Sequence, residues 1–317
     1  RQGFTVAGFS GLLRGRDDSG NYGLDFTVTN STNLITSPLF ESTYTGAQFS
    51  NFVIKGMGAS TGIEDAKPNI NAILVESATG TTFDNITIED CSIAPTMSSG
   101  LSEAYNVGLL VGSASRCSFS NISFEGTNNE IDLTVNYDNV PSSNFTVSVG
   151  MVAGNIGAST SSSSTMTVVS GIKFGAGATS AYGSNINIAF TGNTSTEKPL
   201  TLNVGHIAGS TGGMDLDLVN YEEDDNFFNL RTKIDTQDKN LIDTLNAGGL
   251  FGITNGILEA NLLQRVAEQN NLSINYKLDG DDEETADKIE AVTAKFASVG
   301  GLFGRITGST NSQFTVE

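Results

Sequence analysis

Glu41 and Glu76 are the first candidates for chemistry, because they occupy the same position in successive copies of a repeated motif. If these copies stack as adjacent coils, the two carboxylates lie about 5 Å apart, which is one strand spacing. Asp84 and Asp90 follow Glu76 in the same copy. Such carboxylates can bind calcium, or divide into the acid and base of glycoside cleavage. The alternative is a solvated turn, which the sequence favours because no Lys or Arg cluster stands nearby to bind a uronic acid.

His206 is the only histidine, so a Ser-His-Asp relay, a His-rich zinc site or a histidine general base would each require it. It replaces Leu109 and Met151 in an apolar column of the repeat, as expected of an ordinary packed or surface ring. Cys91 and Cys117 lack metal-ligand spacing and fall in different columns, so we expect two reduced thiols. The sequence therefore offers no catalytic and no cofactor-binding residue, and it predicts that the chain is not an enzyme.

Acidic residues are concentrated between Asp215 and Lys295, where 18 acids stand against 7 bases. Oxygen-rich loops of this kind can bind calcium, although none has EF-hand spacing and most charge runs are solvated loops. Calcium is thus the only cofactor left open, and its candidate ligands are Asp279, Asp281, Asp282 and Glu283.

The charge of the whole chain limits its partners. The formal net charge is -19, which repels phosphate backbones and anionic lipid surfaces, so we expect no nucleic-acid partner. No apolar run approaches the roughly 18 residues of a membrane span, so we expect none.

A Gly-bounded apolar motif recurs along the chain and must position these side chains. Short β-type segments bounded by Gly, Ser, Asn and Thr separate the copies, with insertions of varying length. Such strands bury a face only by stacking on equivalent strands, so the sequence predicts an all-β, right-handed parallel β-helix of about eight coils. We expect one solenoid domain over residues 1–317, of which residues 215–295 form an acidic, insertion-rich part. Five copies are clear: Asn106–Gly112, Ser148–Gly154, Asn203–Gly209, Asn246–Gly252 and Ser298–Gly304.

One column of this repeat is aliphatic in every copy, and we expect it to form the core. Its members are Leu13, Leu39, Leu74, Leu110, Val152, Ile207, Leu250 and Leu302. The column that contains Val111 and Phe251 is interpreted as outward-facing and covered by helices over Ile257–Glu268 and Glu284–Phe296, with a second wall of the core as the alternative.

Polar columns are predicted beside the aliphatic one. Asn51, Asn85 and Asn121 are expected to stack at a bend and bond one another. Lys55 stands one copy before Glu89, which predicts a surface ion pair.

The segments Gly249–Gly252 and Gly301–Gly304 both read Gly-Leu-Phe-Gly, follow an Ala-Gly or Val-Gly pair, and precede ITNGI or RITGS. They resemble the GLUG repeat of bacterial surface adhesins and of some immunoglobulin A-cleaving metallopeptidases. The resemblance implies an extracellular repeat region. The enzymatic half of that family does not carry over, because the sequence holds no HExxH motif.

Three functional classes follow, all at an extracellular or cell-surface location. The first is a non-enzymatic adhesin or stalk that displays loops on a β-helix to a host or surface glycan or protein. The second is a filament subunit that joins copies of itself head to tail, and the third is a polysaccharide lyase or hydrolase built on a β-helix.

Overall fold

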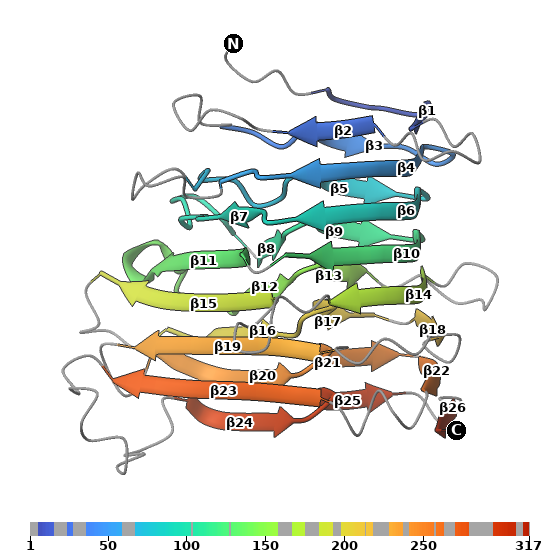
Figure 1. Cartoon of the computed structure of the whole chain (residues 1–317). Helices are drawn as coiled ribbons and strands as arrows, with labels where there is room; N and C mark the ends of the chain where they lie inside the picture. Colours follow the sequence, from blue (N-terminus) through green and yellow to red (C-terminus); the bar gives the residue numbers. More distant parts are fainter. Residues whose placement is uncertain are drawn as a thin grey trace.

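The chain forms a stack of parallel β-strands that coil around one axis, as the computed structural model in Figure 1 shows. The structure describes residues 6–15, 24–27, 36–58, 67–102, 104–126, 128–157, 167–174, 184–192, 198–212, 214–217, 228–236, 241–256, 258–262, 270–278, 294–308 and 313–316. Every pairing between the described strands is parallel and joins one coil to the next, for example Val75 to Val111 and Val111 to Ala153. This confirms the predicted all-β parallel β-helix.

Three sheets form the walls of this helix. The seven-stranded sheet contains β3 (Phe40–Thr43), β5 (Val75–Thr79), β9 (Val111–Ser115), β13 (Ala153–Gly157), β17 (Ala208–Thr211), β21 (Phe251–Gly256) and β25 (Phe303–Gly308). The five-stranded sheet contains β8 (Ala104–Gly108), β12 (Phe145–Gly150), β16 (Leu200–Val204), β20 (Ile242–Gly248) and β24 (Ala294–Gly300).

The long, fourteen-stranded sheet consists of two columns side by side. The first holds β1 (Leu12–Arg14), β2 (Leu24–Thr27), β4 (Gln48–Lys55), β6 (Thr82–Glu89), β10 (Ser118–Glu125), β14 (Thr167–Phe174), β18 (Met214–Asp217), β22 (Leu258–Leu262) and β26 (Gln313–Val316). The second holds β7 (Ser92–Ile93), β11 (Asn129–Asn136), β15 (Ser184–Thr191), β19 (Phe228–Thr236) and β23 (Asn270–Leu278), and a short 3-10 helix, η1 (Tyr137–Asn139), follows β11.

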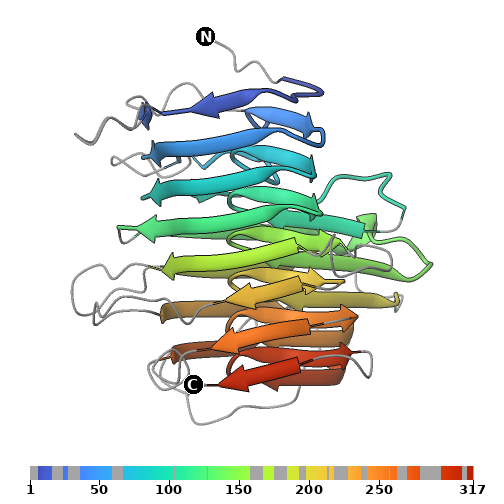
Figure 2. The ribbon, with the colours of Figure 1, turned by 90° about the vertical axis from the view of Figure 1, so that its right-hand side faces the viewer.

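The coil is right-handed. In Figure 1 the strands of the long sheet run to the left in front, those of the other two sheets run to the right behind, and the chain descends from the N-terminus to the C-terminus. Figure 2 shows the same levels from the side. Seven levels carry a strand of the seven-stranded sheet, and Val6 and Phe9 add an eighth by bridging to Phe40 and Thr43. This agrees with the expected eight coils.

The aliphatic column forms the core, with one exception. Leu74, Leu110, Val152, Ile207 and Leu250 are fully buried, and Leu39 and Leu302 pack against them at the ends of the stack. Leu13 does not belong to this column, because it pairs with Phe49 on the long sheet. The prediction that Leu13 belongs to this column was wrong, although Leu13 does pack against the core. Gly11–Gly15 imitates the motif by composition, whereas the bridge from Val6 to Phe40 sets the true register of the first coil.

Phenylalanines continue the core on the long sheet. Phe49, Phe83 and Phe119 are fully buried and stack with ring centroids 5.4 and 4.9 Å apart and nearly parallel planes. Each buried side chain contributes about 1.5 to 3 kcal/mol, and each stacked pair adds about 0.5 to 1.5 kcal/mol.

The column of Val111 and Phe251 is a second wall of the core, not an outward face. Both residues are fully buried, as is His206 in the other neighbouring column. No covering helix is therefore needed. Where the structure describes the two expected helices, they are strands: Leu258–Leu262 pairs with β18, and Ala294–Phe296 begins β24. These segments have helical periodicity but form strands, because the strands of the preceding coil offer unpaired backbone groups that an extended chain can bond.

The asparagine column lies at a bend, as predicted, but only one of its two expected bonds forms in the described part of the chain, because Asn121 Nδ2 donates to Asp84 Oδ1 at 3.1 Å instead of to Asn85. Asn51, Asn85 and Asn121 adopt left-handed φ values of 58°, 51° and 55°, and the Asn85 side chain donates to Asn51 Oδ1 at 2.8 Å. The following level carries Gly171, whose φ of +60° continues the same bend without a side chain. Asparagine and glycine are the residues that tolerate this region, so they mark the bend.

The paired glycines of the motif allow two backbones to approach closely. A Cβ on Gly154 would lie 2.4 Å from the backbone nitrogen of Val107 in the coil above. A Cβ on Gly252 would lie 2.5 Å from the nitrogen of Val204 in the same way. A side chain at the second glycine is therefore excluded wherever a strand of the five-stranded sheet lies beside it.

The five-stranded sheet starts only at β8, which is its edge strand. In the coil above, the segment at residues 68–73 forms no strand. Its backbone bonds β8 at Asn71, where the Gly108 N–H donates to the Asn71 carbonyl oxygen at 2.9 Å. In the described part of the chain the solenoid is thus narrower above β7 and β8 and wider from there on, and Figure 1 shows the wider part in the lower left.

Candidate ligand-binding cleft

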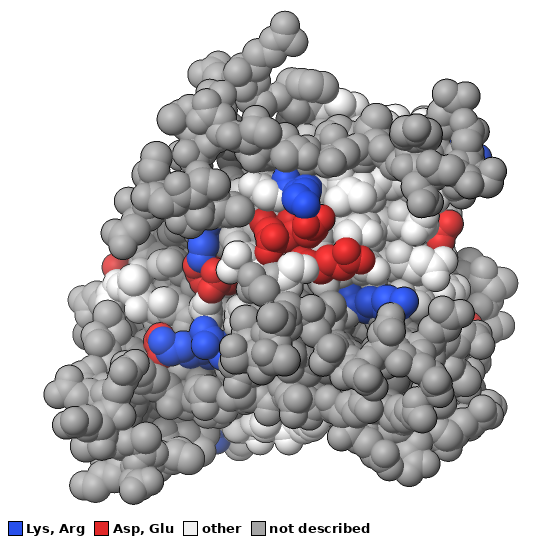
Figure 3. All heavy atoms as spheres, in the orientation of Figure 1, with Lys and Arg blue, Asp and Glu red and all other residues white. Residues whose placement is uncertain are grey.

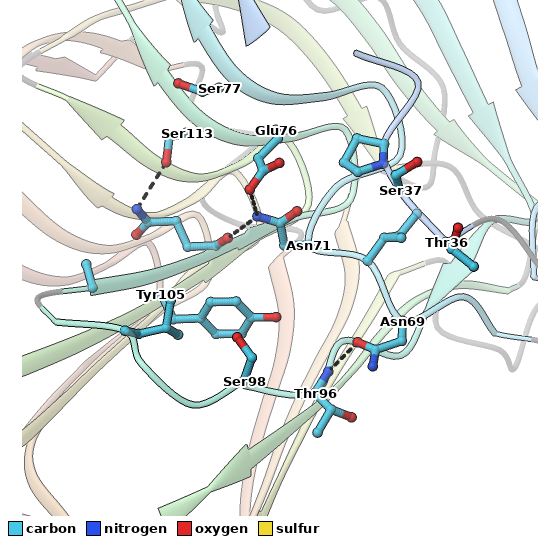
Figure 4. A pocket seen from close by; sticks show the side chains of 15 residues that line it. Thr36, Ser37, Asn69, Asn71, Glu76, Ser77, Thr96, Ser98, Tyr105 and Ser113 are labelled. Carbon is cyan, nitrogen blue, oxygen red and sulfur yellow. Dashed lines mark hydrogen bonds between the residues drawn. The ribbon is translucent and has the colours of Figure 1, made fainter. Parts of the chain in front are cut away.

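A cleft of about 590 Å³ lies where the solenoid widens, beside the outer edge of β8. Figure 4 shows its side chains, which come from the coil of residues 36–38, the segment at residues 69–77 and the chain from Thr96 to Ser113. Most are uncharged and polar: Thr36, Ser37, Ser77, Thr96, Ser98 and Ser113 carry hydroxyls, and Asn69, Asn71 and Asn106 carry amides. Its volume lies in the range of small-molecule sites.

Glu76 projects into this cleft because its coil has no strand of the five-stranded sheet beside it. It pairs in register with Gly112, the second glycine of the next motif. At Gly112 a side chain is excluded by the Glu76 carbonyl, which would lie 2.6 Å from a Cβ. Above β8 no strand of the five-stranded sheet stands beside this position, so a glutamate fits where later coils require glycine. The departure of Glu76 from the motif therefore marks the cleft.

Hydrogen bonds order the polar groups of the cleft. Asn71 Nδ2 lies 3.5 Å from both Glu76 Oε1 and the Asn106 carbonyl oxygen, at the long end of hydrogen-bonding range. The Asn106 amide donates to Ser113 Oγ at 3.0 Å. On the opposite side the Thr96 backbone donates to Asn69 Oδ1 at 2.9 Å. Among the described residues no hydrogen bond occupies the Asn69 amide nitrogen or Glu76 Oε2, so both keep bonding capacity for a ligand.

Tyr105, on β8, is the aromatic side chain of the described lining, and Figure 4 shows its ring beside Ser98. Burial, and secondarily the negative charge of Glu76, raise the pKa of the Tyr105 hydroxyl to about 12. The phenol is therefore uncharged at neutral pH and presents a ring and a hydroxyl.

The structure gives the four predicted carboxylates separate places. Glu41 lies directly above Glu76 in register, as expected, but both are exposed and only Glu76 lines the cleft. Asp84 Oδ1 accepts from Ser120 Oγ at 2.7 Å on the long sheet. Asp90 Oδ1 accepts from the backbone N–H of Asn128 at 3.2 Å. The two aspartates thus bond the next coil and do not join the glutamates.

His206 is a core residue. It is fully buried, its Nε2 lies 3.3 Å from Thr232 Oγ1, and its ring meets that of Phe174 edge-on. Burial lowers the pKa of the imidazole to about 3. The neutral ring has no route to a substrate, which agrees with the packed ring expected from its column.

Cys91 and Cys117 are free and buried, as expected, and burial raises the pKa of both thiols, to about 12 for Cys91. The calcium candidates Asp279, Asp281, Asp282 and Glu283 lie outside the described residues. Among those that are described, no three His, Cys, Asp or Glu side chains are grouped so as to hold a metal ion.

Charges are paired on the front of the long sheet, where Figure 3 shows acidic and basic side chains close together. Lys55 and Glu89 form the predicted ion pair. Lys67 also bridges Glu130 and Asp132. These exposed or half-buried pairs neutralise one another at small net gain in stability.

The sequence did not single out Asn71, Tyr105 or Asn106 as site residues. A signal was present: Glu76 and Ala72 both replace motif glycines, and no Asn-Val-Gly segment precedes them. These changes indicate that the coil of Ala72 and Glu76 has no strand at the position that β8 occupies in the next coil.

Comparisons with known proteins add no relative. No family model, no curated protein and no solved structure matches this chain. In the described part of the chain, no helix has the length and apolar character needed to cross a bilayer.

Proposed function

We propose that this chain is an extracellular, non-enzymatic surface protein, an adhesin or stalk whose β-solenoid presents the β8 cleft and its coil loops to a partner. The observation that carries the proposal is the uninterrupted in-register stack, which forms a rod about 38 Å long from eight levels at about 4.8 Å each. Such a rod holds a binding cleft at a fixed distance from either end.

The cleft favours recognition over bond cleavage. Glycoside cleavage uses a pair of carboxyl groups that flank the bond, whereas Glu76 is the one carboxylate among the described lining residues. The mutual hydrogen bonds of Asn71, Asn106 and Ser113 hold the polar groups in place before a ligand arrives, which lowers the entropy cost of binding.

An array of host-surface glycans and proteins, probed with the purified chain with and without calcium, tests this function. We expect binding to at least one member of the array. Polysaccharides that include polyuronates should yield no new reducing ends and no unsaturated products. Turnover that disappears in a Glu41→Ala, Glu76→Ala double variant would establish an enzyme instead, and an array with no bound member would refute the surface role.

A second candidate is head-to-tail assembly, favoured by apolar side chains exposed along the edge strands β24 and β25. Val299 continues the column of Ala247, which is buried, yet Val299 is 51% exposed. Phe296 and Ile306 of this coil are also exposed, at 69% and 48%. We propose that a second copy of the chain covers this edge by strand pairing.

Electron microscopy and sedimentation distinguish this candidate. Filaments, or a mass that grows with concentration and falls to the monomer in Val299→Lys, would support it. A monomer at all concentrations would exclude it, and Val168→Lys, at an exposed valine of β14 in the middle of the stack, provides the matched control.

A further inference from the structure

The lining of the β8 cleft selects a class of ligand, and this inference rests on the proposed function. The described lining contains no Lys, Arg or His. An anionic ligand such as a phosphate, a sulfate or a uronic acid would find only the carboxylate of Glu76 and no counter-charge. A metal ion would find a single carboxylate, which is too few ligands for a calcium site.

The polar groups of the cleft match a ligand rich in hydroxyls. Hydroxyl and amide side chains can donate and accept in turn, as the neighbouring hydroxyls of a sugar ring require. Glu76 Oε2 and the Asn69 amide retain acceptor and donor capacity on opposite sides of the cleft. The Asn71 amide nitrogen lies 3.5 Å from Glu76 Oε1, which leaves Oε2 as the oxygen to which a sugar hydroxyl would donate.

The apolar groups of the cleft match the other half of a sugar's chemistry. A pyranose ring has C–H faces that pack on an aromatic ring, and Tyr105 places its ring and hydroxyl in the cleft, with Leu101 also in the lining. The Tyr105 hydroxyl stays uncharged at neutral pH, so it adds no repulsion to an uncharged ligand.

We propose that the cleft beside β8 binds a short neutral saccharide of the partner surface, with Tyr105 packing on a sugar ring and Glu76 accepting from its hydroxyls. Binding removes polar groups from water on both sides, so it requires these groups to be paired in the complex. A saccharide supplies such pairs around the whole lining.

A glycan array containing neutral, sialylated, sulfated and uronate-bearing members tests this proposal, followed by titration with cellotriose, maltotriose and chitotriose. We expect binding to neutral members, and a Kd that rises at least tenfold in Tyr105→Ala and in Glu76→Ala. Tyr105→Phe, which keeps the ring, should raise the Kd less.

Glu41→Ala is the matched control for Glu76→Ala, since it changes the same motif position one coil above and outside the cleft. Tyr44→Ala, at an exposed ring, is the control for Tyr105. Both controls should leave the Kd unchanged within about twofold, and circular dichroism should show all variants folded.

The outcomes separate this proposal from the function on which it rests. A chain that binds array proteins or anionic glycans but no neutral glycan retains its surface role and overturns the saccharide assignment. Neutral glycans bound equally by wild type, Tyr105→Ala and Glu76→Ala would place the site elsewhere and overturn it too. An array with no bound member overturns both.

Discussion

The close approach at Gly154 makes a sharp prediction about the motif. In Gly154→Ala the new Cβ would lie 2.4 Å from the Val107 nitrogen and 2.8 Å from the Ser148 oxygen. Ordinary contact begins near 3.4 Å, so one backbone must move by about 1 Å against strands paired on the next coil. Overpacking of this kind costs about 1 to 3 kcal/mol, or more where the neighbours are backbone.

Gly157 provides the control, because it lies in the same strand, β13, and a Cβ there would meet nothing closer than 3.5 Å. Both substitutions restrict the unfolded chain equally and gain about 0.4 to 1 kcal/mol from this effect. Because this gain cancels in the comparison, we expect Gly154→Ala to have a free energy of unfolding at least about 1 to 3 kcal/mol below that of Gly157→Ala. The chain has no tryptophan, so urea unfolding should be followed by circular dichroism. Equal unfolding midpoints for the two variants would refute the steric explanation of the glycine pair.

Two further variants test the bend and the buried histidine. Asn85→Gly should destabilise the chain by about 1 kcal/mol, because the hydrogen bond to Asn51 is lost. Asn85→Ala should destabilise it by about a further 1 to 2 kcal/mol, because alanine disfavours the left-handed φ of 51°. A higher urea midpoint for Asn85→Ala than for Asn85→Gly would contradict the left-handed bend. For His206, burial lowers the pKa of the folded imidazole to about 3, from the usual 6.5 of an exposed histidine. The unfolded chain therefore binds the proton first, and stability falls as the pH drops below 6.5. Between pH 7 and pH 5 wild type should lose about 2 kcal/mol more than His206→Met, and a parallel loss in both proteins would show that the imidazole is not buried.

Much of the fold could be predicted from side-chain columns. The column from Leu74 to Leu302 and the stack of Asn51, Asn85 and Asn121 repeat at each coil, because equivalent positions experience the same neighbours above and below. Local patterns failed where pairing overrides them. Leu258–Leu262 has helical periodicity but pairs with β18, and Gly11–Gly15 resembles the motif but lies on the long sheet.

The cleft could be predicted only in part. The position of Glu76 in the motif was clear from the sequence, and its register below Glu41 is confirmed. The approach of Tyr105 and Asn106 depends on the start of the five-stranded sheet at β8 and on the path of residues 68–73 above it. That path is set by contacts between coils, such as the Ala94 amide donating to Pro68 O, which no local pattern records.

Distances along one column test the stacked coil most directly. Ser42, Ser77, Ser113 and Arg305 belong to a single column of the seven-stranded sheet, which passes through Asn155, Ser210 and Ile253. Spin labels on Arg305→Cys paired in turn with Ser113→Cys, Ser77→Cys and Ser42→Cys, in a chain with Cys91 and Cys117 replaced by alanine, can be measured by pulsed electron paramagnetic resonance. The stack predicts separations near 19, 24 and 29 Å, rising by about 4.8 Å per coil apart from a constant label contribution. Separations that do not increase in this order, or that rise by unequal steps, would contradict the in-register solenoid and with it the origin of the cleft at β8.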